Sequence, residues 1–178
     1  MPTWLTISKE EVKNTTNSIF YTGAQNFLLA MLSFTCGYYF TSAVDHSSPA
    51  IDGLWAVIAA ILVFQTSFEE TIKSAQIRIF SSLIGSVIAS VYLSIFSFSV
   101  LGLGICTFLG IIICYVFHVP DRVRITSVSI AVIMLISSVN PEINPFLNGS
   151  LRFVESIVGS VVAIGVSLIP IPKEIIKD

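Results

Sequence analysis

Long uncharged, mostly apolar runs alternate with short polar segments along the whole chain. The runs cover residues 14–44, 53–68, 79–120, 125–141 and 156–172. A membrane-spanning helix needs about 20 residues, so the run at 79–120 holds two helices, broken near Ser97-Phe98-Ser99. The pattern therefore predicts six spans, at 19–44, 53–67, 79–97, 100–118, 124–139 and 151–170.

The composition supports this prediction. The chain is 54% hydrophobic and 11% charged, with a mean hydropathy of +0.87, so a water-soluble domain would lack the polar residues to cover its surface. We expect an all-α polytopic membrane protein, a single membrane domain over residues 1–178 that has the lipid bilayer as a partner and binds no nucleic acid.

One segment occurs twice, 74 residues apart. Residues 78–95 align with residues 152–169, and seven of the 18 positions are identical, among them Arg78/Arg152 and Gly85/Gly159. Internal repeats in apolar chains are typical of transporters, whose two halves meet at a substrate path. The predicted repeats cover 18–97 and 98–172. Each holds three spans, and an odd number inverts the second repeat relative to the first.

The basic residues are distributed unevenly about the predicted spans. Eight of the nine lysines and arginines fall on one predicted side of the membrane, and only Arg152 falls on the other. Because basic loops stay in the cytoplasm, both termini should be cytoplasmic, and the loops at 45–52 and 140–149 should be external. We expect a multi-pass protein of a bacterial inner membrane. The eight residues of the basic side are Lys9, Lys13, Lys73, Arg78, Arg122, Arg124, Lys173 and Lys177.

Two arginines are candidates for a substrate path. Arg78 and Arg152 each stand near the start of a predicted span. If both face the interior, they place a positive charge near each mouth of a path, which suits an anionic substrate because an intramembrane cation is costly unless it is paired or functional. Alternatively, each guanidinium snorkels to the headgroups, or Arg152 forms a purely structural pair with Glu155, one turn further on.

Small residues recur at helical spacing around these arginines. Ser82 and Ser156 occupy equivalent repeat positions and could line a conduit, although such stripes more often let helices approach closely. Four glycines are predicted to serve helix packing: Gly85, Gly102, Gly110 and Gly159.

The spans at 53–67 and 124–139 are the shortest, and they occupy matching places in the two repeats. Short segments at such places indicate a binding site, or an ordinary mismatch that the bilayer absorbs by thinning. Trp55 could stack on an aromatic substrate or belong to the aromatic belt. Gln65 could hydrogen-bond a substrate or meet the headgroups.

No enzyme signature is present. The chain has no Cys-x-x-Cys, P-loop or Gly-x-Ser-x-Gly motif, and His46 and His118 lie on opposite predicted sides of the membrane. We expect no catalytic residue, no metal and no cofactor.

The motifs resemble those of a known family. Leu54-Trp-Ala-Val-Ile-Ala-Ala-Ile-Leu-Val-Phe-Gln65, the Arg78-Ile-x-x-x-Leu-Ile-Gly85 segment and Arg152-x-x-Glu155-x-x-x-Gly159-x-x-x-Ala163 are similar to the membrane domain of the fusaric acid resistance and aromatic acid exporter family. Plant aluminium-activated malate channels are more distantly similar. The resemblance implies a six-helix unit, usually paired in a dimer or pseudodimer, that moves organic anions across the cytoplasmic membrane.

The expected function is therefore a transporter or exporter subunit for small organic anions, with aromatic acids among the candidate substrates. A passive anion channel and a non-transporting scaffold or accessory subunit are the alternatives. Family members often carry a cytosolic domain or a second membrane unit, whereas this sequence ends at Asp178. A homodimer or larger homo-oligomer is expected to supply the second unit. Family members often have Gly-Thr where Ser81-Ser82 stand here, so the resemblance does not define the substrate.

Overall fold

The described part of the chain folds into six α-helices, and the all-α prediction is confirmed. The computed structural model describes residues 9–44, 49–140 and 142–169, and no strand occurs within these ranges. A 3-10 turn, η2 (Pro120–Arg122), precedes the fifth helix. The helices are α1 (Lys9–Val44), α2 (Pro49–Val63), α3 (Phe68–Ile95), α4 (Val100–Val116), α5 (Val123–Val139) and α6 (Pro145–Ser167).

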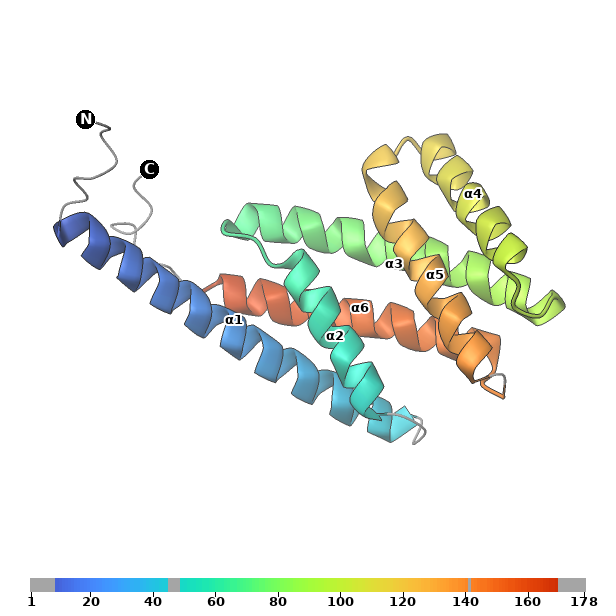
Figure 1. The fold of residues 1–178 in the computed structure, drawn as a ribbon, viewed down its shortest axis with the longest axis horizontal. Helices are drawn as coiled ribbons and strands as arrows, with labels where there is room; N and C mark the ends of the chain where they lie inside the picture. Colours follow the sequence, from blue (N-terminus) through green and yellow to red (C-terminus); the bar gives the residue numbers. More distant parts are fainter. Residues whose placement is uncertain (1–8, 45–48, 141, 170–178) are drawn as a thin grey trace, which may run out of the picture.

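Two antiparallel helices form the centre of the bundle. α3 and α6 pack along each other in opposite directions, with α1 and α2 on one side and α4 and α5 on the other (Figure 1). α2 packs mainly against α1 and α6, whereas α5 packs mainly against α3 and α4. Each central helix is thus covered by a short helix from the other half of the chain.

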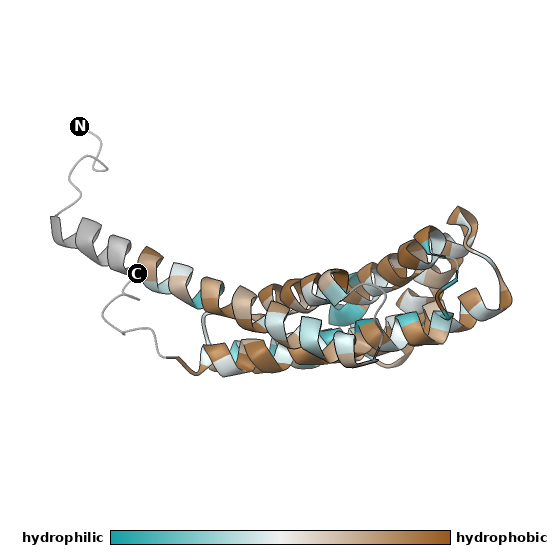
Figure 2. Cartoon of the chain, turned by 90° about the horizontal axis from the view of Figure 1, so that it is seen from below, coloured by the Kyte–Doolittle hydropathy of each residue, from teal (hydrophilic) through white to brown (hydrophobic). Residues whose placement is uncertain are grey.

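The outer faces of the helices are apolar, as a lipid environment requires. Figure 2 shows strongly hydrophobic positions along most of the bundle, and exposed large side chains include Phe27, Leu101 and Phe108. Within the described residues, three segments are long and apolar enough to cross a membrane: Phe68–Ile95, Pro120–Val139 and Pro145–Ser167. α2 and α4 are shorter apolar helices. The chain is therefore a multi-pass membrane protein.

Small residues form the contacts between helices. The buried face of α4 consists of Gly102, Cys106, Gly110 and Cys114, so this stripe packs against the bundle. Each of the four glycines predicted for packing lies against another helix. A Cβ added at Gly85 would meet Ser129 of α5, and one added at Gly159 would meet the backbone of Ala56 in α2. A Cβ added at Gly102 would meet Tyr92 of α3, and one added at Gly110 would meet Ile130 of α5.

The predicted break between the third and fourth spans is confirmed. α3 ends at Ile95 and α4 begins at Val100, where the Ser99 hydroxyl accepts a hydrogen bond from Gly102 N at 3.0 Å.

Two predicted loops are partly wrong. α6 begins within the expected loop 140–149, because Asn144 caps the helix by accepting bonds from Phe146 N (2.9 Å) and Leu147 N (3.4 Å), and Pro145 suits a first helical position. α2 likewise begins at Pro49, so Asp52 is helical rather than part of a loop at 45–52. α3 begins at Phe68, so residues 68–78 are helical and continuous with the predicted span at 79–97. Residues 45–48 lie outside the described ranges.

Candidate functional site

Six of the seven predicted path residues line one small cavity among α2, α3, α5 and α6. The cavity has a volume of about 40 Å³, enough for water but too small for an organic acid. Its remaining lining is mostly apolar, with Val128 and Val132 of α5 among it. The six residues are Trp55, Arg78, Ser82, Arg152, Glu155 and Ser156.

The contact between α3 and α6 positions the two arginines. Ser156 Oγ lies 3.0 Å from both Ser82 Oγ and the Arg152 carbonyl oxygen. Arg78 precedes Ser82 by four residues, and Arg152 precedes Ser156 by four, which is about 6 Å along each helix. α3 and α6 run antiparallel (Figure 1). Because Ser82 and Ser156 are in contact, Arg78 and Arg152 lie on opposite sides of this serine pair along the helix axes.

Both arginines lie within their helices rather than at the helix starts, and both line one cavity. Arg78 stands ten residues after the start of α3, and Arg152 stands seven residues after the start of α6. Arg78 is 7% exposed and Arg152 is 8% exposed. Such burial within the bundle argues against the snorkelling alternative, since a snorkelling guanidinium would reach the surface.

Arg152 is surrounded by two carboxylates. Its Nη2 donates to Asp52 Oδ1, and its Nη1 lies 2.8 Å from Glu155 Oε2, close enough for an ion pair although the direction does not qualify as a hydrogen bond. Asp52 is 4% exposed and Glu155 is 3% exposed. The Trp55 ring centroid lies 5.8 Å from Arg152 Cζ, within the range of a cation–π contact.

Sequence reasoning identified Glu155 as a partner of Arg152 but missed Asp52. Glu155 follows Arg152 by three residues on the same helix, a spacing that brings side chains together. Asp52 is 100 residues away in the chain and was assigned to a loop. One signal could have shown that Asp52 faces α6. Asp52 stands four residues before Ala56, on the face of α2 that packs against Gly159.

Arg78 has a different environment. Among the residues that the structure describes, no carboxylate forms an ion pair with it, and its Nε and Nη1 have no hydrogen-bond partner. The other buried residues of α3 are all small, with Ser81, Ser82 and Gly85 as its neighbours. Arg78 is therefore a buried cation that no acid of the described residues compensates.

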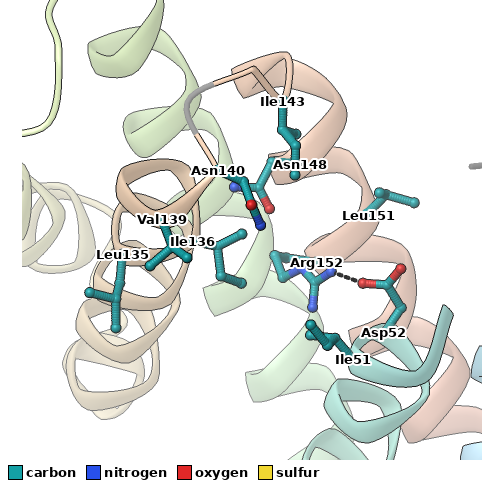
Figure 3. Close-up of a pocket in the computed structure, with 10 residues that line it drawn as sticks. All are labelled: Ile51, Asp52, Leu135, Ile136, Val139, Asn140, Ile143, Asn148, Leu151 and Arg152. Carbon is teal, nitrogen blue, oxygen red and sulfur yellow. Dashed lines mark hydrogen bonds and ion pairs between the residues drawn. The ribbon is translucent and has the colours of Figure 1, made fainter. Parts of the chain in front are cut away.

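A second cavity adjoins the first at Arg152. Its volume is about 200 Å³, and it is lined by Asp52, Arg152, Asn148 and apolar side chains of α5 (Figure 3). Asn148 Nδ2 donates to Ile133 O at 3.1 Å and to Ser137 Oγ at 2.9 Å, which ties α6 to α5. Arg152 lines both cavities and therefore stands between them.

Most of the chain matches a known family. A family model described as "Aromatic acid exporter family member 1" matches residues 32–169, from within α1 to beyond the end of α6. This protein belongs to the aromatic acid exporter family. Membership implies a role in membrane export or transport rather than catalysis, and it confirms the family resemblance seen in the sequence. No curated protein and no solved structure matches the chain.

Gln65 does not join the other candidates of this exporter-family chain. It is exposed in the link between α2 and α3, where its backbone N–H donates to Thr71 Oγ1 at 3.1 Å.

The helix lengths only partly match the two short spans predicted at 53–67 and 124–139. α2, with 15 residues, is the shortest of the described helices, but α4 and α5 both have 17. Helix length alone therefore does not distinguish α5 as a site helix.

The structure describes one of the two histidines of this exporter-family chain. His118 is exposed after the end of α4, with a φ of 56°, and His46 falls outside the described residues. Within residues 9–44, 49–140 and 142–169, no group of three His, Cys, Asp or Glu side chains could hold a metal ion.

Proposed function

We propose that this protein is a subunit of an exporter that carries small organic anions, aromatic acids among them, across a bacterial inner membrane. The observation that carries the proposal is Arg78, a buried cation without an acidic partner among the described residues, in a cavity that it shares with Arg152. Family membership supports the transport role. A charged side chain within a membrane protein is costly and marks substrate or ion pathways.

The chemistry of the cavity suits a carboxylate. A guanidinium presents its N–H groups in a planar fork that matches two carboxylate oxygens, and charge-assisted bonds of this type are strong where water is excluded. Ser82 and Ser156 add hydroxyl groups to the same cavity. An anion there would offset the cost of burying Arg78.

The small volume of the cavity favours a transporter over a permanently open channel. An organic acid does not fit in about 40 Å³, so the helices around the arginines must separate before a substrate enters. Flux measured with and without a proton gradient distinguishes driven export from passive conduction. Equal flux under both conditions would favour a channel.

The transport unit is a homodimer or larger, with six spans arranged as two inverted repeats and both termini in the cytoplasm. The contacts of Gly85 with α5 and of Gly159 with α2 support the repeat, because these glycines are equivalent in the sequence alignment. Native mass spectrometry in mild detergent tests the assembly, and monomers alone would contradict it.

Uptake of aromatic and dicarboxylic acids into proteoliposomes tests the function. Arg78→Gln should lower anion flux at least tenfold, the order expected when a hydrogen-bonded charge is lost, and Arg78→Lys should keep part of the flux. Arg124→Gln is the matched control, since Arg124 is an exposed residue at the start of α5. Unchanged flux in a folded Arg78→Gln variant would remove the anion-path assignment.

A further inference from the structure

The two arginines are equivalent in the repeat but not in their electrostatic surroundings. Arg152 is in contact with Asp52 and Glu155, whereas no acid of the described residues pairs with Arg78. If the repeat holds, each residue around Arg152 has a counterpart around Arg78.

The glycines give the register for this comparison. A Cβ at Gly159 would meet the carbonyl oxygen of Ala56, Cβ of Ala59 and N of Ala60. A Cβ at Gly85 would meet the carbonyl oxygen of Thr126, Cβ of Ser129 and N of Ile130. The three contacts are the same in kind and order, and each α5 residue lies 70 positions after its α2 counterpart.

Neither counterpart of the two acids is acidic. In the register of the glycines, Asp52 of α2 corresponds to Arg122, and in the sequence repeat Glu155 corresponds to Ser81. Ser81 Oγ donates to the Arg122 carbonyl oxygen at 3.3 Å, so the two counterparts are in contact. The Arg122 guanidinium lies 4.6 Å from the centre of the Phe80 ring.

We propose that Arg78 alone binds the substrate carboxylate, whereas Arg152 is a copy of the same site that is permanently occupied by Asp52 and Glu155. This inference rests on the proposed function and assigns its binding residue. A carboxylate on Arg78 would take the place that the protein's own acids take on Arg152. The burial of both guanidiniums makes a single carboxylate on Arg78 favourable, since an unpaired buried charge is otherwise costly.

The same arrangement selects against a second negative charge. Glu155 lines the cavity that contains Arg78, and Asp52 lies on the other side of Arg152. A second carboxylate on the substrate would meet these acids and find no free cation there. The site should therefore prefer monocarboxylates to dicarboxylates of the same shape.

A tethered competitor tests the proposal. Ser81→Glu places a carboxylate three residues after Arg78, as Glu155 stands three residues after Arg152, and Ser81→Gln is the neutral variant of the same size. Binding of benzoate to the purified full chain is measured by isothermal titration calorimetry in detergent. We expect Ser81→Glu to bind benzoate at least tenfold more weakly than Ser81→Gln, as befits the loss of a charge-assisted bond. Equal affinities in the two variants would overturn the proposal.

A second measurement needs no variant, so it holds even if Ser81 variants fail to fold. Terephthalate carries a second carboxylate on the benzoate ring, and it should bind the natural chain at least tenfold more weakly than benzoate. Equal affinities would overturn the proposal. If the natural chain transports both acids alike, Arg78 selection fails while the exporter assignment stands. If it neither binds nor transports any organic anion of the panel, the proposed function fails as well.

Discussion

At the scale of single residues, the Asp52–Arg152–Glu155 cluster is the most consequential feature that sequence reasoning did not fully predict. The repeat drew attention to Arg152, and helical spacing identified Glu155. Asp52 was not predicted as a partner because a contact between residues 100 positions apart leaves no periodic pattern in one sequence. With two acids on one guanidinium, the expected simple pair becomes a three-residue cluster.

The cluster makes a specific prediction for stability. Arg152→Gln should destabilise the protein by about 3 to 5 kcal/mol, because it leaves two buried carboxylates without a cation. Adding Glu155→Gln should restore only part of the loss, since Asp52 stays unpaired, and adding Asp52→Asn should restore most of it. Thermal unfolding in detergent measures these steps. Full recovery in the variant that combines only Arg152→Gln and Glu155→Gln would mean that Asp52 is not part of the cluster.

At the scale of helices, element type was easier to predict than element boundaries. Apolar runs identified every helix, but the start of α6 was assigned to a loop because Asn144-Pro145 is common in turns. The same two residues cap and begin helices, and only their neighbours decide which role they take. Arg152 consequently lies two turns inside α6 rather than at its start, so the position of the site depended on that boundary.

Helix packing gives a test with an internal control. Gly159→Ala would place a Cβ 2.4 Å from the Ala56 carbonyl oxygen, a backbone atom that cannot move aside cheaply, so we expect a loss of about 1 to 3 kcal/mol of stability. Gly165, on the same helix, has nothing within 4 Å of such a Cβ. Gly165→Ala should be neutral or stabilising by up to about 1 kcal/mol. Thermal unfolding in one detergent compares them, and an equal loss in both variants would contradict the contact between α2 and α6.

At the scale of the whole molecule, composition predicted a membrane bundle, and the repeat drew attention to Arg78, Ser82, Arg152 and Ser156. They could not predict that both arginines line one cavity, because this depends on the antiparallel crossing of α3 and α6 at Ser82 and Ser156. The distribution of basic residues predicts the orientation of the bundle, which the helix packing itself does not determine.

That orientation is testable with single cysteines in a background in which Cys36, Cys106 and Cys114 are replaced by alanine. Glu142 and Thr66 are exposed in the α5–α6 and α2–α3 links, at opposite ends of the predicted spans. Because the basic residues Lys73, Arg122 and Arg124 fall on the side of Thr66, Glu142→Cys should react with a membrane-impermeant maleimide in intact cells. Thr66→Cys should react only after the cells are opened, which shows that its thiol is accessible. Labelling of Thr66→Cys alone in intact cells would reverse the orientation and place the Arg78 site nearer the external side, where it would suit capture from outside rather than export.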